Sequence, residues 1–432
     1  AMEETLEEVY YESEGWSTGC SDMGDVSMVI PSVHPYIGGA VGTGHGADYY
    51  IPDVYTATVD SARVQAAMLV KLLENDGARV AEIKKNFGFG CMRFPTVDEA
   101  VDVGAVMEMV DYFMEAGFNY FDTARPYHGG ASEGVLKTCL TSRYPRESYV
   151  LTDQLSPTKF ETEEDIRPLF EDQLNQCGVE YFDFYLFHAN SAKRHQFFTE
   201  TRAYDIAQEL KAQGKIRHVG FSFHDSAEVL DRILTDRPEM EFVQLQVNYV
   251  DQEDPNVQSR ACYEVCRKHG KPVVVMEPVK GGSLINLPPK ALELMEGVSP
   301  ANFAIRYAAG FDNTFMTLSG MSNLEQMQDN LSFMRDFQPL TTREQEIISQ
   351  VRTLYQAQHR IPCTACRYCV DGCPAGIPIP DVFAAMNAHL QQEEGAAGQY
   401  AAFENNASAC VGCGQCEAIC PQQLHIRSLL QE

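Results

Sequence analysis

The sequence predicts an α/β protein in which a parallel (β/α)8 barrel, the TIM-barrel class, is followed by a cysteine-rich domain. Between residues 86 and 335, eight short apolar runs alternate with longer stretches of helical periodicity. The apolar runs are nearly continuous, as in strands that are buried on both faces. Eight of the fourteen cysteines fall within residues 363–432, in two copies of one spacing.

The eight apolar runs are the expected barrel strands. In chain order they are FGFGCM, NYFDTA, YVLTDQ, FDFYLFH, HVGFSF, FVQLQVN, PVVVMEP and TFMTLSG. Helical periodicity marks residues 104–116, 163–177, 200–213, 226–236, 256–269 and 301–310. Because the polar residues that end barrel strands gather at one face, we expect the functional site at the carboxyl ends of the strands.

The pattern divides the chain into four segments. Residues 86–335 form the barrel, residues 336–362 a polar, helix-prone linker, and residues 363–432 the cysteine-rich domain. Residues 1–85 hold a Gly-rich stretch, GGAVGTGHGADYY, and one long helical run, with little other apolar patterning. A segment of this size folds alone only marginally. We therefore expect it to pack on the barrel or to mediate homo-oligomer contacts.

The composition argues against two classes of partner. The formal net charge of −28 at pH 7 disfavours binding to nucleic acid or to an anionic membrane. No apolar run approaches the roughly 20 residues of a membrane span, and no signal peptide opens the chain. The other six cysteines lie in apolar or helical contexts, as reduced, buried thiols do. A cytoplasmic location is expected.

The cysteine spacing is typical of iron–sulfur binding. Cys363-x2-Cys366-x2-Cys369-x3-Cys373-Pro recurs as Cys410-x2-Cys413-x2-Cys416-x3-Cys420-Pro. Three thiolates at this spacing bind one [4Fe–4S] cluster, and the fourth reaches across to the other cluster. The two predicted ligand sets are Cys363, Cys366, Cys369 and Cys420, and Cys410, Cys413, Cys416 and Cys373. Zinc is the alternative, although it usually takes two Cys-x2-Cys pairs.

This repeat resembles the bacterial two-cluster ferredoxin domain. The resemblance implies one-electron transfer, with a one-electron donor or acceptor protein as a partner. A purely structural role for the clusters is the alternative.

Six motifs of the barrel segment together resemble the aldo/keto reductase family, in its branch with a ferredoxin-like C-terminal extension. They are GFGCMRFP (88–95), AGFNYFDTARPYHGGASE (116–133), YFDFYLFHA (181–189), GKIRHVGFSFHD (214–225), EPVKGGSL (277–284) and LSGMSNLEQMQDN (318–330). The resemblance implies a (β/α)8 barrel that reduces a small-molecule carbonyl with a nicotinamide hydride.

The resemblance also implies catalytic residues. In the family a tyrosine protonates the carbonyl oxygen, assisted by an aspartate, a lysine and a histidine. Asp122 and Tyr127 fit the pattern DTAxxY, and His188 fits the strand end YLFHA. Where the family places the lysine, this chain has Gln154.

The change to Gln154 puts the acid catalysis in question. A free tyrosine has a pKa of about 10, and a neighbouring lysine lowers that pKa by favouring phenolate. Glutamine donates a hydrogen bond but supplies no charge. Asp122 loses its cation as well, so it must protonate, stay hydrated or pair elsewhere. Arg125 and Lys159 are the nearest cations in sequence, although a solvated surface position is expected for both.

The cofactor contacts follow from the same resemblance. Ser222 stands where the family meets the nicotinamide carboxamide, and His224, two residues on, is either a pocket residue or a loop residue. The loop LSGMSN resembles the one that holds the cofactor phosphates, which implies contacts from Gly320, Ser322 and Asn330. That motif contains no arginine or lysine, so NADH is favoured over NADPH. A flavin is an alternative cofactor, but no flavin motif is present.

Residues 15–85 resemble the C-terminal end of the M20 family of metal-dependent amidohydrolases. His45 stands where that family places its last metal ligand, but the other ligands and the catalytic glutamate are absent. A lone histidine cannot hold a two-metal site. We therefore expect a fragment used for packing or assembly.

Three functional hypotheses follow. The first is nicotinamide-dependent carbonyl reduction, with the clusters serving structure or a redox side path. The second is a cluster-fed electron-transfer reductase, in which Tyr127 need not act as a strong acid. The third is a catalytically silent barrel kept for assembly. The loops HANSAKRHQFF (188–198) and VNYVDQEDP (247–255) are the predicted pocket walls, and they do not name a substrate.

Overall fold

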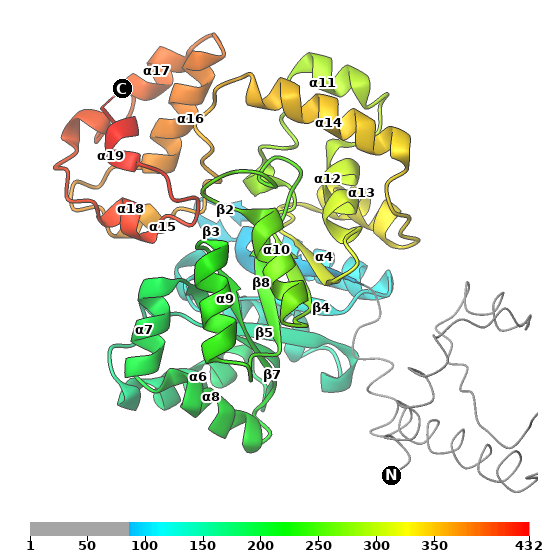
Figure 1. The fold of residues 1–432 in the computed structure, drawn as a ribbon, viewed down its shortest axis with the longest axis vertical. Coiled ribbons are helices and arrows are strands. Elements are labelled where there is room, and N and C mark those ends of the chain that lie inside the picture. The colour runs from blue at the N-terminus through cyan, green and yellow to red at the C-terminus, as the bar shows by residue number, and fades with distance from the viewer. Residues whose placement is uncertain (1–85, 432) are drawn as a thin grey trace, which may run out of the picture. The chain divides into compact units, whose positions relative to one another are not determined.

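The structure, a computed structural model, describes residues 86–431. The N-terminal resemblance, His45 and the expected oligomer contacts lie outside the described residues. Eight parallel strands close into a barrel in the order β1-β10-β9-β8-β7-β6-β5-β4 (Figure 1). The predicted (β/α)8 barrel is therefore confirmed.

All eight predicted apolar runs are strands of this barrel. They are β1 (Phe87–Gly90), β4 (Tyr120–Asp122), β5 (Val150–Leu155), β6 (Phe182–Asn190), β7 (Ile216–Phe223), β8 (Phe242–Gln246), β9 (Val273–Met276) and β10 (Thr314–Ser319). Two short antiparallel strands, β2 (Thr96–Val97) and β3 (Ala100–Val101), follow β1. Every residue of β5, β6 and β8 is buried, as the continuous apolar runs predicted.

Helices follow the strands and surround the barrel (Figure 1). They are α4 (Val103–Glu115), α5 (Ser132–Leu136), α6 (Glu163–Cys177), α7 (Ala192–Glu200), α8 (Ala203–Ala212), α9 (Ala227–Asp236), α10 (Ser259–Lys268), α11 (Pro289–Leu294), α12 (Pro300–Ala309) and α13 (Leu324–Met334). Helix α6 shows why the predicted boundaries hold. Thr162 and Asp165 form a capping box at its start, and Gly178 ends it with φ 67°.

The segment after the barrel contains helix α14 (Thr342–Gln356). Its buried residues Ile348, Val351 and Tyr355 share an apolar cluster with Leu287 and Ala291 of the α11 region. The polar, helix-prone segment thus contributes a packed helix to the outside of the barrel.

The cysteine-rich domain has an apolar cluster of its own, centred on Ile377, Ile379, Val382, Phe383 and Ile426. Its helices are α15 (Tyr368–Asp371), α16 (Ile379–Leu390), α17 (Ala396–Ala401), α18 (Gln415–Ile419) and α19 (Ile426–Leu429).

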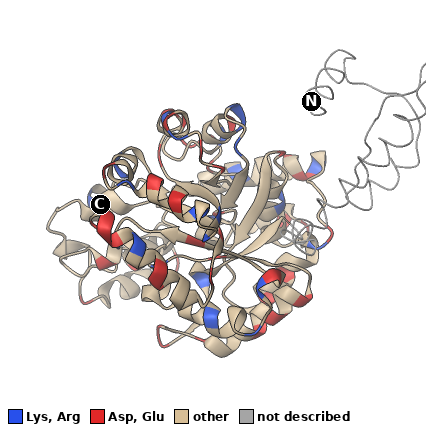
Figure 2. Cartoon of the chain, turned by 90° about the horizontal axis from the view of Figure 1, so that it is seen from below, with Lys and Arg blue, Asp and Glu red and all other residues tan. Residues whose placement is uncertain are grey.

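Charged side chains of both signs are interspersed over the outer helices (Figure 2). Among the helices of residues 86–431, none is both long and apolar enough to cross a membrane.

Candidate active site

The mouth of the barrel collects polar side chains because strand residues alternate between two faces. Inside the barrel, buried apolar side chains such as Tyr120, Val150 and Leu186 fill the interior. Two residues further along the same strands come Asp122 and His188, and Gln154 is four residues beyond Val150. The same face that forms the core therefore presents the predicted site residues where each strand ends.

Gln154 joins the predicted catalytic residues into one hydrogen-bonded network. Its Nε2 donates to Asp122 Oδ1 at 3.3 Å and to the Tyr127 hydroxyl at 3.5 Å. Its Oε1 accepts from Ser222 Oγ at 3.2 Å, and Ser222 Oγ accepts from the backbone N–H of Ala189 at 2.7 Å. The amide thus occupies the position at which a cation would touch both Asp122 and Tyr127.

Asp122 is buried without a counter-charge. Its Oδ2 has no hydrogen-bond partner, and among the described residues no ion pair reaches it. Burial raises the pKa of Asp122 to about 8, against which the hydrogen bond from Gln154 acts only in part. The carboxyl is therefore protonated at neutral pH.

Neither cation near Asp122 in sequence compensates for the missing lysine. Arg125 pairs with Glu133 at 3.2 Å and with Asp172 at 2.6 Å. Lys159 is exposed beyond the end of β5. Arg125 is therefore not a partner of Asp122. The expected solvated surface position is also wrong for Arg125, whose side chain is 16% exposed and pairs with Glu133 and Asp172.

His188 is held in a neutral form. Its Nδ1 lies 2.7 Å from Ser156 Oγ, and its Nε2 lies 3.5 Å from the Tyr368 hydroxyl. Burial, with smaller effects from the charges of Arg194 and His224, lowers the pKa of His188 to about 3. The ring stands edge-to-face with Tyr127, with 6.1 Å between the ring centroids.

Tyr368 brings the cysteine-rich domain into the site. It lies between Cys366 and Cys369, and its ring stands edge-to-face with His188. Tyr368 and Cys366 line the same cavity, of about 390 Å³, as Asp122 and Tyr127. A predicted cluster ligand is therefore part of the pocket wall.

Backbone contacts fix the segment that carries Tyr368. Arg93 Nη2 donates to the carbonyl oxygen of Thr364 at 2.6 Å, and Nη1 donates to that of Ala365 at 3.3 Å. Gly281 has φ 60°, and a Cβ there would lie 2.4 Å from the Thr364 carbonyl oxygen. Glycine is thus required for this close approach.

A buried polar network fixes the second segment of the domain, just after Cys420. Lys280 Nζ and Asp251 Oδ1 form a buried ion pair at 2.5 Å. Gln246 and Gln422 exchange amide hydrogen bonds of 3.0 and 2.9 Å, and Gln246 also donates to Asp251. Both segments of the first predicted cluster site are therefore attached to the barrel.

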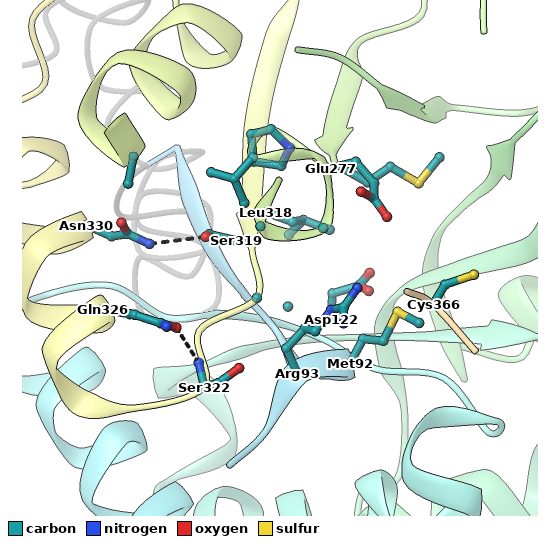
Figure 3. Close-up of a pocket in the computed structure, with 18 of the residues that line it drawn as sticks. Met92, Arg93, Asp122, Glu277, Leu318, Ser319, Ser322, Gln326, Asn330 and Cys366 are labelled. Atoms are coloured by element: carbon teal, nitrogen blue, oxygen red, sulfur yellow. Dashed lines mark hydrogen bonds between the residues drawn. The ribbon is translucent and has the colours of Figure 1, made fainter. Parts of the chain in front are cut away.

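The cavity continues from the catalytic residues to the predicted cofactor loop. Gly320, Ser322 and Asn330 all line it. Asn330 donates to Ser319 Oγ at 3.1 Å, and Gln326 accepts from the Ser322 backbone N–H at 2.8 Å (Figure 3). These bonds hold the start of α13 against the end of β10, so the loop is shaped before a ligand binds.

Two further cavity residues were not predicted. Gln244, in the middle of β8, has a buried Oε1 without a hydrogen-bond partner. Asp329 accepts from Ser299 Oγ at 2.7 Å at the far end of the groove. His224, for which two readings were open, lines the cavity.

None of the eight cysteines of the repeat, all of which the structure describes, forms a disulfide. Cys363, Cys366, Cys369 and Cys420 line one small cavity, as the predicted crossed ligation requires. Within residues 86–431, no group of three or more His, Cys, Asp or Glu side chains has the geometry of a single-ion site. A four-iron cluster is bound by four separate thiolates rather than by a convergent single-ion set, and the donor set fits such a cluster.

The residues missed by sequence reasoning share one property. Tyr368 and Gln244 belong to no chemical motif, and their roles depend on contacts with distant segments. Arg194 lies in the predicted pocket wall 188–198, but no motif singles it out there. In the repeat, the spacing signal identifies only the cysteines and carries no information about Tyr368 between them.

Comparison with known proteins agrees with this architecture. Residues 86–353 match the sequence model described as the aldo/keto reductase family, and residues 362–424 match that of a 4Fe-4S dicluster domain. The NADH-specific methylglyoxal reductase of Escherichia coli (strain K12) is 28% identical over 204 residues, covering 40% of this chain and 57% of that protein. The 9,11-endoperoxide prostaglandin H2 reductase of Trypanosoma cruzi is 24% identical over 258 residues, covering 58% of this chain and 84% of that protein.

Solved structures show the same fold. An aldo-keto reductase from Bacillus halodurans in its holo form has a TM-score of 0.51 and 24% identity, covering 62% of this chain and 91% of that one. One from Klebsiella pneumoniae, in complex with NADPH, has a TM-score of 0.51 and 19% identity, covering 62% and 90%.

Proposed function

The chain belongs to the aldo/keto reductase family and is an oxidoreductase, and from that premise we propose that it reduces the carbonyl of a small molecule with a nicotinamide hydride. The observation that carries the proposal is the network in which Gln154 holds Asp122 and Tyr127 at the mouth of the barrel. All three side chains line one cavity with His188.

Tyr127, His188 and Gln154 have different proposed roles in protonating the carbonyl oxygen of the substrate. Tyr127 would donate the proton to the carbonyl oxygen. Ser156 can donate to Nδ1 of the neutral His188, which leaves Nε2–H to hydrogen-bond that oxygen. Gln154 would orient the Tyr127 hydroxyl, but it supplies no charge to stabilise phenolate. We therefore propose slow reduction compared with a site that keeps the lysine.

The groove fits a nicotinamide cofactor, which supplies the hydride when bound. Gln244 Oε1 is a buried acceptor without a partner, and an amide N–H₂ group is a donor that would satisfy it. At the other end, Asp329 places a carboxylate in the groove. A carboxylate repels a 2′-phosphate and accepts from a ribose hydroxyl, so we propose NADH as the cofactor.

A second function is favoured by the position of Cys366. This predicted cluster ligand lines the same cavity as Asp122 and Tyr127. A cluster held by Cys363, Cys366, Cys369 and Cys420 could therefore supply single electrons to a substrate in that cavity, received from a one-electron donor protein. Gln154 would be acceptable in such a reductase, because Tyr127 need not act as a strong acid.

Anaerobic titration of the reconstituted full chain distinguishes these functions. NADH, NADPH and reduced methyl viologen are added separately, and carbonyl-dependent oxidation of each is followed by absorbance. We expect NADH to bind and to be oxidised. Absence of binding by both nicotinamides would overturn the first function, and turnover with reduced viologen alone would establish the second.

A further inference from the structure

A second cavity lies on the other side of Tyr368 and His188. Its volume is about 520 Å³. The loop after β5, the start of α7, the end of β7 and residues 417–423 of the cysteine-rich domain form its walls. His188, His224, Tyr368 and Pro421 line both cavities. The two cavities therefore meet at His188, and Tyr127 lines the first of them.

Arg194 is the unusual residue in this second cavity. It is half-buried near the start of α7, and its Nη1 donates to the carbonyl oxygen of Ala189 at 2.6 Å. Among the described residues, no carboxylate forms an ion pair with it. Its charge lowers the pKa of both His188 and His224, after the larger effect of burial. Arg194 thus presents a positive charge to the catalytic histidine without a counter-ion.

The carboxylates that line the cavity are already engaged. Asp225 accepts from the backbone N–H groups of Ala192 and Ser226, at 2.9 and 2.7 Å. Glu417 pairs with Arg427 at 2.7 Å. Lys193, exposed beside Arg194, adds a second positive charge to the same wall. Neither carboxylate forms an ion pair with Arg194, so among the described residues its guanidinium is left available to an anion.

We propose that this cavity selects an anionic carbonyl compound, with its carboxylate or phosphate held by Arg194 and its carbonyl oxygen at Tyr127. A half-buried guanidinium without a partner is stabilised by an anion, which it binds through two parallel hydrogen bonds. With an oxo acid, the hydride of NADH goes to the carbonyl carbon and the Tyr127 proton to the oxygen. The products are the hydroxy acid and NAD⁺, and a solvent proton restores Tyr127.

The inference rests on the proposed reduction, so the test includes matched charged and neutral carbonyl compounds. Benzoylformate is compared with its methyl ester, and D-glyceraldehyde 3-phosphate with D-glyceraldehyde, using anaerobically reconstituted full chain and NADH. We expect Arg194→Gln to lower kcat/KM by roughly 10- to 100-fold for the charged member of the preferred pair. The neutral members should change by less than about threefold, and Arg194→Lys should retain part of the preference.

Lys290→Gln is the matched control, because Lys290 is exposed on α11 outside both cavities. It removes one positive charge and should leave both kcat/KM values unchanged. The proposal is overturned if the wild-type protein has the higher kcat/KM with the neutral compounds. It is also overturned if Arg194→Gln lowers kcat/KM equally for the charged and the neutral compound of a pair.

Binding without turnover separates this inference from the proposed reaction. Isothermal titration calorimetry with benzoylformate, with no reduced cofactor present, reports the anion site directly. Benzoylformate binding that weakens in Arg194→Gln but not in Lys290→Gln supports the site, even if NADH is never oxidised. Equal binding by wild type and Arg194→Gln, or no binding of benzoylformate or D-glyceraldehyde 3-phosphate, refutes it.

Discussion

Restoring a lysine at position 154 tests whether this site is a weakened carbonyl reductase. The Gln154 Nε2 that would be replaced lies 3.3 Å from Asp122 Oδ1 and 3.5 Å from the Tyr127 hydroxyl. An ammonium group at this position would face both groups. Gln154→Lys therefore adds the missing charge beside both groups, at the edge of the cavity that Gln154 lines.

The expected gain follows from these distances. An opposite charge within about 4–6 Å lowers the pKa of an acid by about 1–3 units. If half of a two-unit change in the Tyr127 pKa reaches the transition state, the proton transfer accelerates about tenfold. The same charge would pull the pKa of Asp122 down from about 8 toward its ordinary value. Asp122 would then be ionised at neutral pH and paired with the lysine.

The assay measures kcat with NADH and a carbonyl substrate from pH 6 to pH 9, under anaerobic conditions. The kcat of wild type should change with the ionisation of Asp122, whose pKa is about 8. Gln154→Lys should lose this pH dependence, and its kcat should be at least tenfold higher. Gln154→Met keeps the length of the side chain but removes the hydrogen bonds to Asp122 and Tyr127, so its kcat should fall. An unchanged kcat in Gln154→Lys, with NADH binding intact, would refute the reasoning and favour different chemistry.

Two further predictions concern Asp122 and the clusters. The pKa of Asp122 is raised from 3.8 to about 8, so the folded state keeps a proton that the unfolded chain loses between those values. Between these two pKa values, the contribution of Asp122 to the free energy of unfolding should fall by about 1.4 kcal/mol for each unit that the pH rises. In thermal unfolding, the Tm of Asp122→Asn should therefore rise relative to that of wild type from pH 5 to pH 8. A Tm difference that stays constant over this range would contradict a buried neutral carboxyl at Asp122. Cys373→Ser should remove about half of the bound iron, and electron paramagnetic resonance should show loss of the cluster assigned to Cys410, Cys413 and Cys416; loss confined to the other cluster would disprove the crossed ligation.

The barrel was predictable because its local signals agree with its tertiary structure. Each strand overlaps one of the short, mainly apolar runs, and α6 lies over residues 163–177 as expected because Thr162 caps its start and Gly178 its end. Helix α7 was not predicted. Its nine residues, AKRHQFFTE, include only Phe198 as a buried side chain, so its periodicity is too weak to read. Yet α7 carries Arg194, on which the proposed substrate class depends.

The candidate site was predictable only where a motif exists. Asp122, Tyr127 and His188 lie in family motifs. The period-2 alternation of strands turns Asp122 and His188 to the same mouth, and Tyr127 lies in the 3-10 turn Tyr127–Gly130 that follows β4. Whether Asp122 is protonated or paired with a cation was not predictable, because this depends on which residues distant in sequence lie near its carboxyl group. Arg125 is near in sequence, but its guanidinium pairs with Glu133 on another element.

The position of Tyr368 links the two roles that the sequence leaves open for the clusters. Tyr368 lies between two predicted ligands of the first cluster and contacts His188. Because two predicted ligands of that cluster flank Tyr368, we expect loss of the cluster to shift Tyr368 and the pocket lining beside His188, even if no electron ever passes through the iron. Loss of activity on removing iron therefore does not by itself demonstrate electron transfer. Substrate reduction by a one-electron donor in the absence of nicotinamide would demonstrate electron transfer. In that experiment Tyr368 is in place, and only the source of electrons has changed.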